Sequence, residues 1–325
     1  MRVEWLSATA TILAGAACVR AASVIPVEYR IEASVVMTLN GPTDQPMHMP
    51  TDVAVDRAGR VYVADGAHDR VVRFKPDGGF DGVIARDGEQ TLSRPVGLAT
   101  DARDRLWIAD TGNHRLVVVS PEGTSTETIA LPTGTHPCDP TDLLVTPDGR
   151  RTYIVDNDNH RLLVRSNRDG VMDSLGGAGE GLGRFQWPFM VCIGRDDDVF
   201  VSDVIGARVQ RANARHQWTG QIGRWGVELG RLYRPKGVVT DPAGRLLVGD
   251  STLGVIQVFS PNGPIAGVLT RPDGTPLRFD HPMGMTFDAR GRLYVVELQA
   301  HRVVVITMRA TSTVPPKTGE KESER

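Results

Sequence analysis

The chain has 325 residues, a formal net charge of −2, 40% hydrophobic residues and three cysteines. Because the charge is nearly balanced, the excess of Lys and Arg that displaces counterions from nucleic acid is missing, and we expect no nucleic-acid partner. Outside the N-terminal segment only Cys138 and Cys192 remain, at unmatched positions. We therefore expect two free, buried thiols and a fold held by core packing.

The first 21 residues have the pattern of a secretory signal peptide. Arg2 precedes an uncharged stretch over residues 6–19, which is too short to span a bilayer, and small residues follow it. We therefore predict that residues 1–21 are a signal peptide and that the protein is secreted or periplasmic. No other segment is expected to cross a membrane. The alternative is a lipoprotein that begins at Cys18, although Gly15 stands where such signals carry Leu.

An isolated strand is predicted at Ser34–Leu39, ahead of six similar segments that fill most of the chain. Each segment opens with a proline before an apolar run, and an acidic residue closes a second apolar run 15 residues later, or 16 in the third copy. The prolines are spaced by 45, 45, 48, 47 and 47 residues and are Pro50, Pro95, Pro140, Pro188, Pro235 and Pro282. The acids are Asp65, Asp110, Asp156, Asp203, Asp250 and Glu297. Such a period, filled with short strands, predicts an all-β, six-bladed β-propeller with one blade per repeat.

Each repeat supplies strands that are joined by polar turns. In the second copy, apolar runs over 95–100, 106–109 and 116–119 are separated by turn residues, which favours antiparallel hairpins. A fourth, weaker strand follows in most copies, but the sixth copy lacks it. We expect Ser34–Leu39 to take that place and close the ring by pairing with the last blade, so that no edge strand is left exposed.

The repeats resemble those of the NHL-repeat family. The resemblance rests on Asp110–Leu116 (DTGNHRL), on Asp156–Leu162 (DNDNHRL) and on Pro95–Leu98, and it covers residues 34–307. It implies a six-bladed propeller whose ligand sites lie at the mouth of the central channel. Beyond this domain, residues 310–325 contain too little apolar content to fold, and we expect a disordered tail.

The acidic and Arg residues that recur in most repeats are expected to brace turns, because a group copied into every blade cannot converge on one ligand. Positions that differ between repeats are more informative. From those around the predicted channel mouth we select six ligand-facing candidates, which are Asp52, Arg94, Asp142, Trp187, Lys236 and His281. We expect them to bind a peptide, a protein or a glycan, with no cofactor, no catalytic residue and no metal ligand, in a protein that acts as a monomer.

The alternative is an enzyme of the same architecture, either a metal-dependent lyase similar to the peptidyl-hydroxyglycine amidating lyases or a lactonase-like hydrolase. Such lyases carry a histidine directly after the proline of several blades. The corresponding residues here are Thr51, Val96, Thr141, Phe189, Lys236 and Met283. Three other histidines, His48, His136 and His281, lie nearby at unmatched offsets, with His48 and His281 in neighbouring blades. The sequence favours a non-catalytic binding role over this alternative.

Overall fold

The computed structural model describes residues 25–88, 90–261 and 263–309. The predicted signal peptide at residues 1–21 and the predicted tail at residues 310–325 lie outside this part. Within the described residues, the chain is built from β-strands with four single-turn 3₁₀ helices, at Val27–Tyr29, Gly66–His68, Thr111–Asn113 and Arg195–Asp197. The predicted all-β class is confirmed. No helix in these ranges is long and apolar enough to span a membrane.

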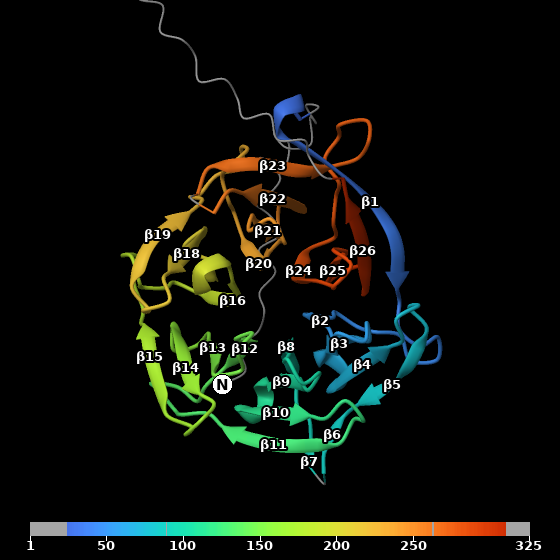
Figure 1. The fold of residues 1–325 in the computed structure, drawn as a ribbon, viewed down its shortest axis with the longest axis vertical. Helices are drawn as coiled ribbons and strands as arrows, with labels where there is room; N and C mark the ends of the chain where they lie inside the picture. The colour runs from blue at the N-terminus through green and yellow to red at the C-terminus, as the bar shows by residue number, and fades with distance from the viewer. Residues whose placement is uncertain (1–24, 89, 262, 310–325) are drawn as a thin grey trace, which may run out of the picture.

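The strands form four-stranded units that surround a central axis (Figure 1). The first four units are separate antiparallel sheets, here called blades 1 to 4. Blade 1 consists of β2 (Val53–Val55), β3 (Val61–Asp65), β4 (Arg70–Phe74) and β5 (Phe80–Ile84), and blade 2 of β8 (Pro95–Thr100), β9 (Leu106–Asp110), β10 (Arg115–Val119) and β11 (Ser125–Ala130). Blade 3 consists of β12 (Pro140–Val145), β13 (Arg151–Asp156), β14 (Arg161–Ser166) and β15 (Met172–Gly176), and blade 4 of β16 (Pro188–Ile193), β17 (Val199–Asp203), β18 (Arg208–Ala212) and β19 (Trp218–Ile222). A small hairpin, β6 (Arg86–Asp87) and β7 (Gln90–Thr91), lies between blades 1 and 2.

Blades 5 and 6 are joined in one eight-stranded sheet by the N-terminal strand β1 (Arg30–Leu39). Blade 5 consists of β20 (Pro235–Thr240), β21 (Leu246–Asp250), β22 (Val255–Phe259) and β23 (Ile265–Thr270). Blade 6 consists of β24 (Pro282–Phe287), β25 (Leu293–Glu297), β26 (Arg302–Met308) and β1 itself. Within the described residues, the strands therefore form six four-stranded blades, one for each repeat.

The predicted ring closure is confirmed. Strand β1 pairs antiparallel with β26, from Ala33 opposite Met308 to Leu39 opposite Val303. Its first three residues also pair parallel with β23, a contact that the sequence did not predict because the strand begins at Arg30 rather than at Ser34. Gly267 in β23 permits this approach, since a Cβ atom there would lie 2.6 Å from the backbone oxygen of Tyr29.

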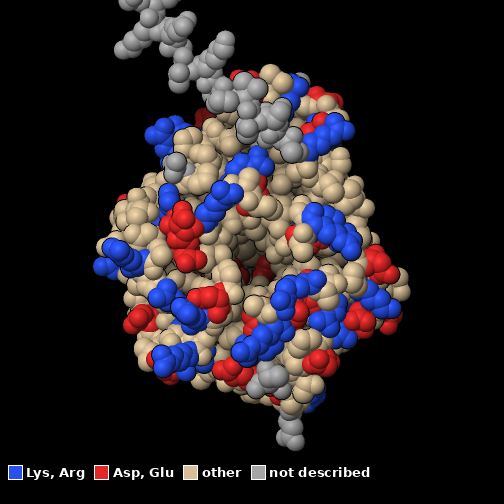
Figure 2. Space-filling model, viewed as in Figure 1, with Lys and Arg blue, Asp and Glu red and all other residues tan. Residues whose placement is uncertain are grey.

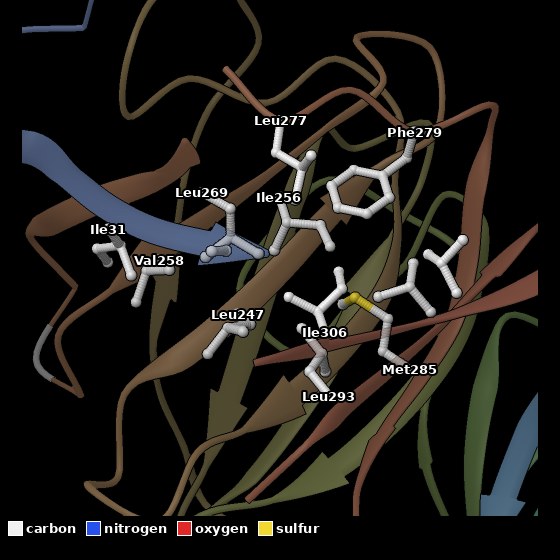
Figure 3. Close-up of a cluster of buried hydrophobic side chains, with 13 residues drawn as sticks. Ile31, Leu247, Ile256, Val258, Leu269, Leu277, Phe279, Met285, Leu293 and Ile306 are labelled. Carbon is white, nitrogen blue, oxygen red and sulfur yellow. The ribbon is translucent and has the colours of Figure 1, made fainter. Parts of the chain in front are cut away.

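The closing strand also contributes to the core between blades 5 and 6 (Figure 3). Ile31 of β1 packs in one buried cluster with Leu269 of blade 5 and with Leu293 and Ile306 of blade 6. Leu39, at the other end of β1, belongs to the cluster between blades 6 and 1. The N-terminal strand thus supplies both backbone pairing and buried apolar surface. Elsewhere, Cys138 and Cys192 are buried free thiols, as expected.

The acidic residue of every repeat anchors the segment that enters its own blade, which confirms the predicted bracing role. Each carboxylate accepts a backbone N–H from a residue one or two positions before the proline, at 2.6–3.0 Å. In five blades an arginine on the third strand also pairs with the acid, as Arg208 does with Asp203 at 3.0 Å. Blade 5 has Val255 at that position instead. The recurrent polar residues therefore fix the loops on which the variable residues stand.

Candidate functional site

The six candidate residues lie at three levels along the innermost strands. Arg94, Trp187 and His281 directly precede the prolines and are substantially exposed, with 61% of the Arg94 side chain and 44% of Trp187 accessible. Lys236 directly follows its proline and is partly buried. Asp52 and Asp142, two residues after their prolines, are buried. The structure therefore does not bring the six residues together on one surface.

Asp52 and Thr51 join blade 1 to blade 2. The Asp52 Oδ2 atom accepts the backbone N–H of Leu98 at 2.7 Å, and its Oδ1 atom accepts that of Val53 at 2.8 Å. The Thr51 hydroxyl donates to the backbone oxygen of Val96 at 2.8 Å. These contacts make the Pro-Thr-Asp sequence of the first repeat a clasp between neighbouring blades.

The same clasp joins blade 3 to blade 4. Asp142 accepts the backbone N–H groups of Leu143 and Val191, both at 2.8 Å, and Thr141 donates to the backbone oxygen of Phe189 at 2.8 Å. Burial raises the pKa of Asp52 to about 7, against the lowering effect of its two backbone hydrogen bonds. Burial, and then the neighbouring Asp52 carboxyl, raise the pKa of Asp142 well above its usual range. Both carboxyls therefore keep their protons to a higher pH than an exposed aspartate does.

The two carboxyls also line a channel cavity of about 280 Å³. Its walls are formed by residues two to five positions after the prolines, most of them apolar, including Leu98, Val191 and Val238. At the level of the carboxyls the strands crowd together, since a Cβ atom on Gly284 would lie 1.9 Å from Asp52 Oδ1. The cavity thus lies in the half of the channel remote from the prolines. Figure 2 shows the central hollow of the ring, with acidic atoms in its depth.

Two of the exposed candidates already have acidic partners. Arg94 Nη2 lies 3.1 Å from Asp139 Oδ1, so this cation pairs with the blade 3 entry. The Nδ1 atom of His281 lies 3.0 Å from Asp280 Oδ1, next to it in the chain. Arg94 and His281 therefore line the proline end of the channel as members of surface pairs.

Trp187 and Lys236 belong to one sector of that end, at the entries to blades 4 and 5. The Lys236 ammonium lies 4.9 Å from the ring centroid of Phe189, and burial lowers the pKa of Lys236. Trp187 is exposed, and its ring meets that of His160 edge to face at 5.7 Å. No carboxylate within the described residues pairs with Lys236. This sector therefore presents an aromatic surface beside a cation that lacks an acidic partner.

The segments that enter blades 4 and 5, residues 177–187 and 223–234, are matched loops. Each is rich in glycine and folds back on itself through one parallel bridge, Ala178 with Phe185 and Trp225 with Leu232. Each also carries an arginine four residues before its proline, at Arg184 and at Arg231. The two loops are therefore structurally equivalent segments at the entries to consecutive blades.

Two buried glutamines hold these loops, and sequence reasoning missed both. Gln210 accepts the N–H of Gly183 at 2.8 Å and donates to the oxygen of Arg184 at 2.6 Å. Gln257 makes the same two bonds, to Gly230 at 2.7 Å and to the oxygen of Arg231 at 2.6 Å. The signal was present in the sequence, because the corresponding position of the other four repeats is apolar, with Val72, Val117, Leu163 and Val304.

The loops present exposed tryptophans among cations. Trp225 is 68% exposed, and its ring lies 6.2 Å from that of Tyr233. Arg234 lies over the Tyr233 ring at 5.2 Å. We call this region the entry-loop surface and define it by Arg184, Trp187, Arg224, Trp225, Arg231 and Arg234. It is the most distinctive feature of the proline end of the ring.

A separate groove of about 550 Å³ lies between blades 1 and 6. The His48 ring lies 4.7 Å from that of His301 and 6.2 Å from that of His68. His48 thus lies beside the turn histidines of blades 1 and 6. Among the residues that the structure describes, no group of three or more His, Cys, Asp or Glu side chains is arranged to hold a metal ion.

Comparison with known proteins connects the repeats to one family. The NHL repeat model matches residues 47–74 and 92–119. A similar curated protein is "Protein brain tumor" of Drosophila melanogaster, 29% identical over 125 residues, which cover 38% of this chain and 12% of that protein. The match thus spans a small part of that relative's length.

Similar solved structures share the fold. A streptogramin B lyase is 12% identical with a TM-score of 0.64, over 84% of this chain and 98% of that one. A virginiamycin B lyase from Staphylococcus aureus is 14% identical with a TM-score of 0.62, over 87% and 89% of the two chains. A gluconolactonase from Xanthomonas campestris is 18% identical with a TM-score of 0.63, over 81% and 87%. The chain thus carries NHL repeats at the two matched segments, which form blade 1 and blade 2, and its ring of four-stranded blades has the β-propeller fold.

Proposed function

We propose that the protein is an exported binding module that holds a peptide, protein or glycan ligand on its entry-loop surface. The observation that carries the proposal is the pair of matched loops, each fixed by a buried glutamine and each carrying an exposed tryptophan and an arginine. Large aromatic side chains anchor ligands with little loss of conformational freedom. Loops that already have one fixed conformation lose little conformational entropy when a ligand binds.

Export and a monomeric state are parts of this proposal. Export is supported by the signal-like pattern of residues 1–21. The monomeric state is supported by ring closure within the chain, since β1 covers the edge of β26 that would otherwise be open to pairing.

The test compares binding of three purified proteins to arrays of glycans and peptides. They are the wild type, the double variant Trp187→Ala/Trp225→Ala, and the control Phe80→Ala, whose ring is 46% exposed on the outer strand of blade 1. We expect ligands of the wild type to be retained by the control and lost by the double variant. Equal binding by all three proteins would place the ligand site elsewhere.

The lyase or lactonase alternative is supported by the fold it shares with the similar structures. It makes a different prediction, which is one divalent ion per chain and a lower melting temperature after chelation. Elemental analysis and melting curves with and without chelator measure both. A tightly held metal would favour that alternative over a binding module, whereas an unchanged melt of metal-free protein would count against it.

A further inference from the structure

The cations of the entry-loop surface lack acidic partners. The surface has four arginines, Arg184, Arg224, Arg231 and Arg234, and Lys236 at the entry to blade 5 is a fifth cation of the same sector. None of the five lies within ion-pair distance of a carboxylate among the described residues. At the entry to blade 2, by contrast, Arg94 pairs with Asp139. The surface therefore offers positive charge that the protein itself does not neutralise.

Two acidic residues lie in the same loops but do not neutralise the cations. Glu180 accepts the side-chain amide of Gln186 at 3.3 Å, and Glu228 accepts the backbone N–H of Val227 at 3.3 Å. The carboxylates of Asp203 and Asp250 are buried and accept loop N–H groups. None of these carboxylates forms an ion pair with the five cations, so the cations are left to pair with acidic groups of a ligand.

We infer that the ligand is a polysaccharide whose sugar units carry carboxylates, an inference that rests on the proposed binding function of the entry-loop surface. Four of the five cations are arginines, and the planar guanidinium matches a carboxylate through two parallel hydrogen bonds. Lysine would supply charge without that geometry. The arginines thus favour carboxylates as the anionic groups of the ligand.

The tryptophans favour sugar rings as the body of the ligand. Trp225 and Trp187 are 68% and 44% exposed and offer broad, rigid apolar faces. An acidic sugar unit combines an apolar ring face with a carboxylate and so meets a tryptophan and an arginine at once. In an acidic peptide these two contacts would need different residues.

The repetition of the loops favours a polymer. Arg184 and Arg231 occupy the same position in loops displaced by 47 residues, and each loop carries its own exposed tryptophan. Strands β16 and β20, which the loops enter, belong to consecutive blades, so the two loops are neighbours around the ring. A chain of identical sugar units can place one carboxylate at each of these arginines, whereas the two tryptophans stand at different positions of the loops.

Calorimetric titration of the mature protein with polygalacturonate tests this inference. The site variant is Arg184→Gln/Arg231→Gln/Arg234→Gln. The matched control is Arg103→Gln/Arg215→Gln/Arg290→Gln, which removes the same charge from exposed turns at the opposite end of the blades. Loss of three exposed ion pairs between arginine and carboxylate corresponds to a fall in affinity of about tenfold or more. We expect that fall in the site variant, and a fall in affinity of less than about twofold in the control.

Other polymers separate the possible outcomes. Neutral dextran should not bind, and poly-L-glutamate and single-stranded oligo-dT should bind much more weakly than polygalacturonate. Equal binding of poly-L-glutamate or of oligo-dT would overturn the polysaccharide inference, because charge alone would then suffice. Absence of polygalacturonate binding would overturn it as well. In each case, array ligands whose binding depends on Trp187 and Trp225 would still support the proposed binding function. Failure of the polysaccharide inference is therefore distinguishable from failure of the proposed function.

Discussion

Two buried carboxyl groups, those of Asp52 and Asp142, combine a structural role with an unusual pKa. Each accepts a backbone N–H from the next blade, and burial raises both pKa values. Both residues are candidates from the sequence because they differ between repeats, but one repeat does not show that their side chains contact the neighbouring blade. Their burial depends on how closely adjacent strands approach, which one repeat does not reveal.

The raised pKa of Asp52 predicts how stability changes with pH. A carboxyl whose folded pKa lies near 7 binds its proton more tightly in the folded state than in the unfolded state, where the value is near 3.8. Its contribution is therefore fully present below about pH 4 and is lost as the pH rises through about 7. Asp52→Asn should flatten the fall in stability across this window, measured by urea unfolding at a series of pH values. The control Asp158→Asn, which removes an exposed carboxylate, should leave the slope unchanged, and an unchanged slope in Asp52→Asn would refute the assignment.

At the scale of elements, the entry loops differ in how firmly they are held. Loop 177–187 is fixed by Gln210 and also by Arg208, which donates to the backbone oxygen of Arg184 at 2.7 Å. Loop 223–234 has Gln257 but no arginine, because Val255 replaces it. The sequence contains Val255 in place of the arginine and glycines in both loops. It did not assign the glutamines, since their partners are backbone atoms more than 25 residues away.

This difference predicts unequal effects of two equivalent substitutions. Replacing Gln257 with leucine leaves the N–H of Gly230 and the C=O of Arg231 without these bonds, at a cost of about 1–3 kcal/mol for each group. Replacing Gln210 removes the bond of the Gly183 N–H, but the C=O of Arg184 keeps its bond from Arg208. We expect Gln257→Leu to open loop 223–234 to proteolysis and to hydrogen exchange. Gln210→Leu should affect loop 177–187 less, because Arg208 still holds it. Limited proteolysis with mass spectrometry measures both, and greater exposure in Gln210→Leu would contradict the proposed order.

For the whole molecule, one strand completes the ring and joins two blades. Six prolines, six acids and one unpaired apolar segment were enough to predict the number of blades and the closure of the last blade by β1, because both follow from counting strands. The parallel pairing of β1 with β23 was not predictable, since it depends on Arg30–Glu32 and on the space beside Gly267. The candidate site was predicted less well: of the six residues selected, only Trp187 belongs to the entry-loop surface.

Loss of the closing strand should prevent folding. Deletion of residues 28–40 removes the pairing of β1 with β26 and β23, together with the buried Ile31 and Leu39. A few net hydrogen bonds at about 1 kcal/mol each, with two buried side chains at about 1.5–3 kcal/mol each, are comparable to a typical total stability of about 5–15 kcal/mol. We expect insoluble or unfolded protein by size-exclusion chromatography and circular dichroism. A soluble monomer that melts cooperatively at the wild-type temperature would show that closure is dispensable.

The most direct test of ligand binding at the entry-loop surface is hydrogen–deuterium exchange of the purified protein, with and without a saturating ligand. Polygalacturonate and the strongest ligand from the arrays would each be used. We predict slower exchange in peptides from residues 177–187 and 223–234 and no change in the channel walls at 96–100 and 238–240. Protection confined to the channel walls or to blades 1 to 3 would contradict binding at the entry loops.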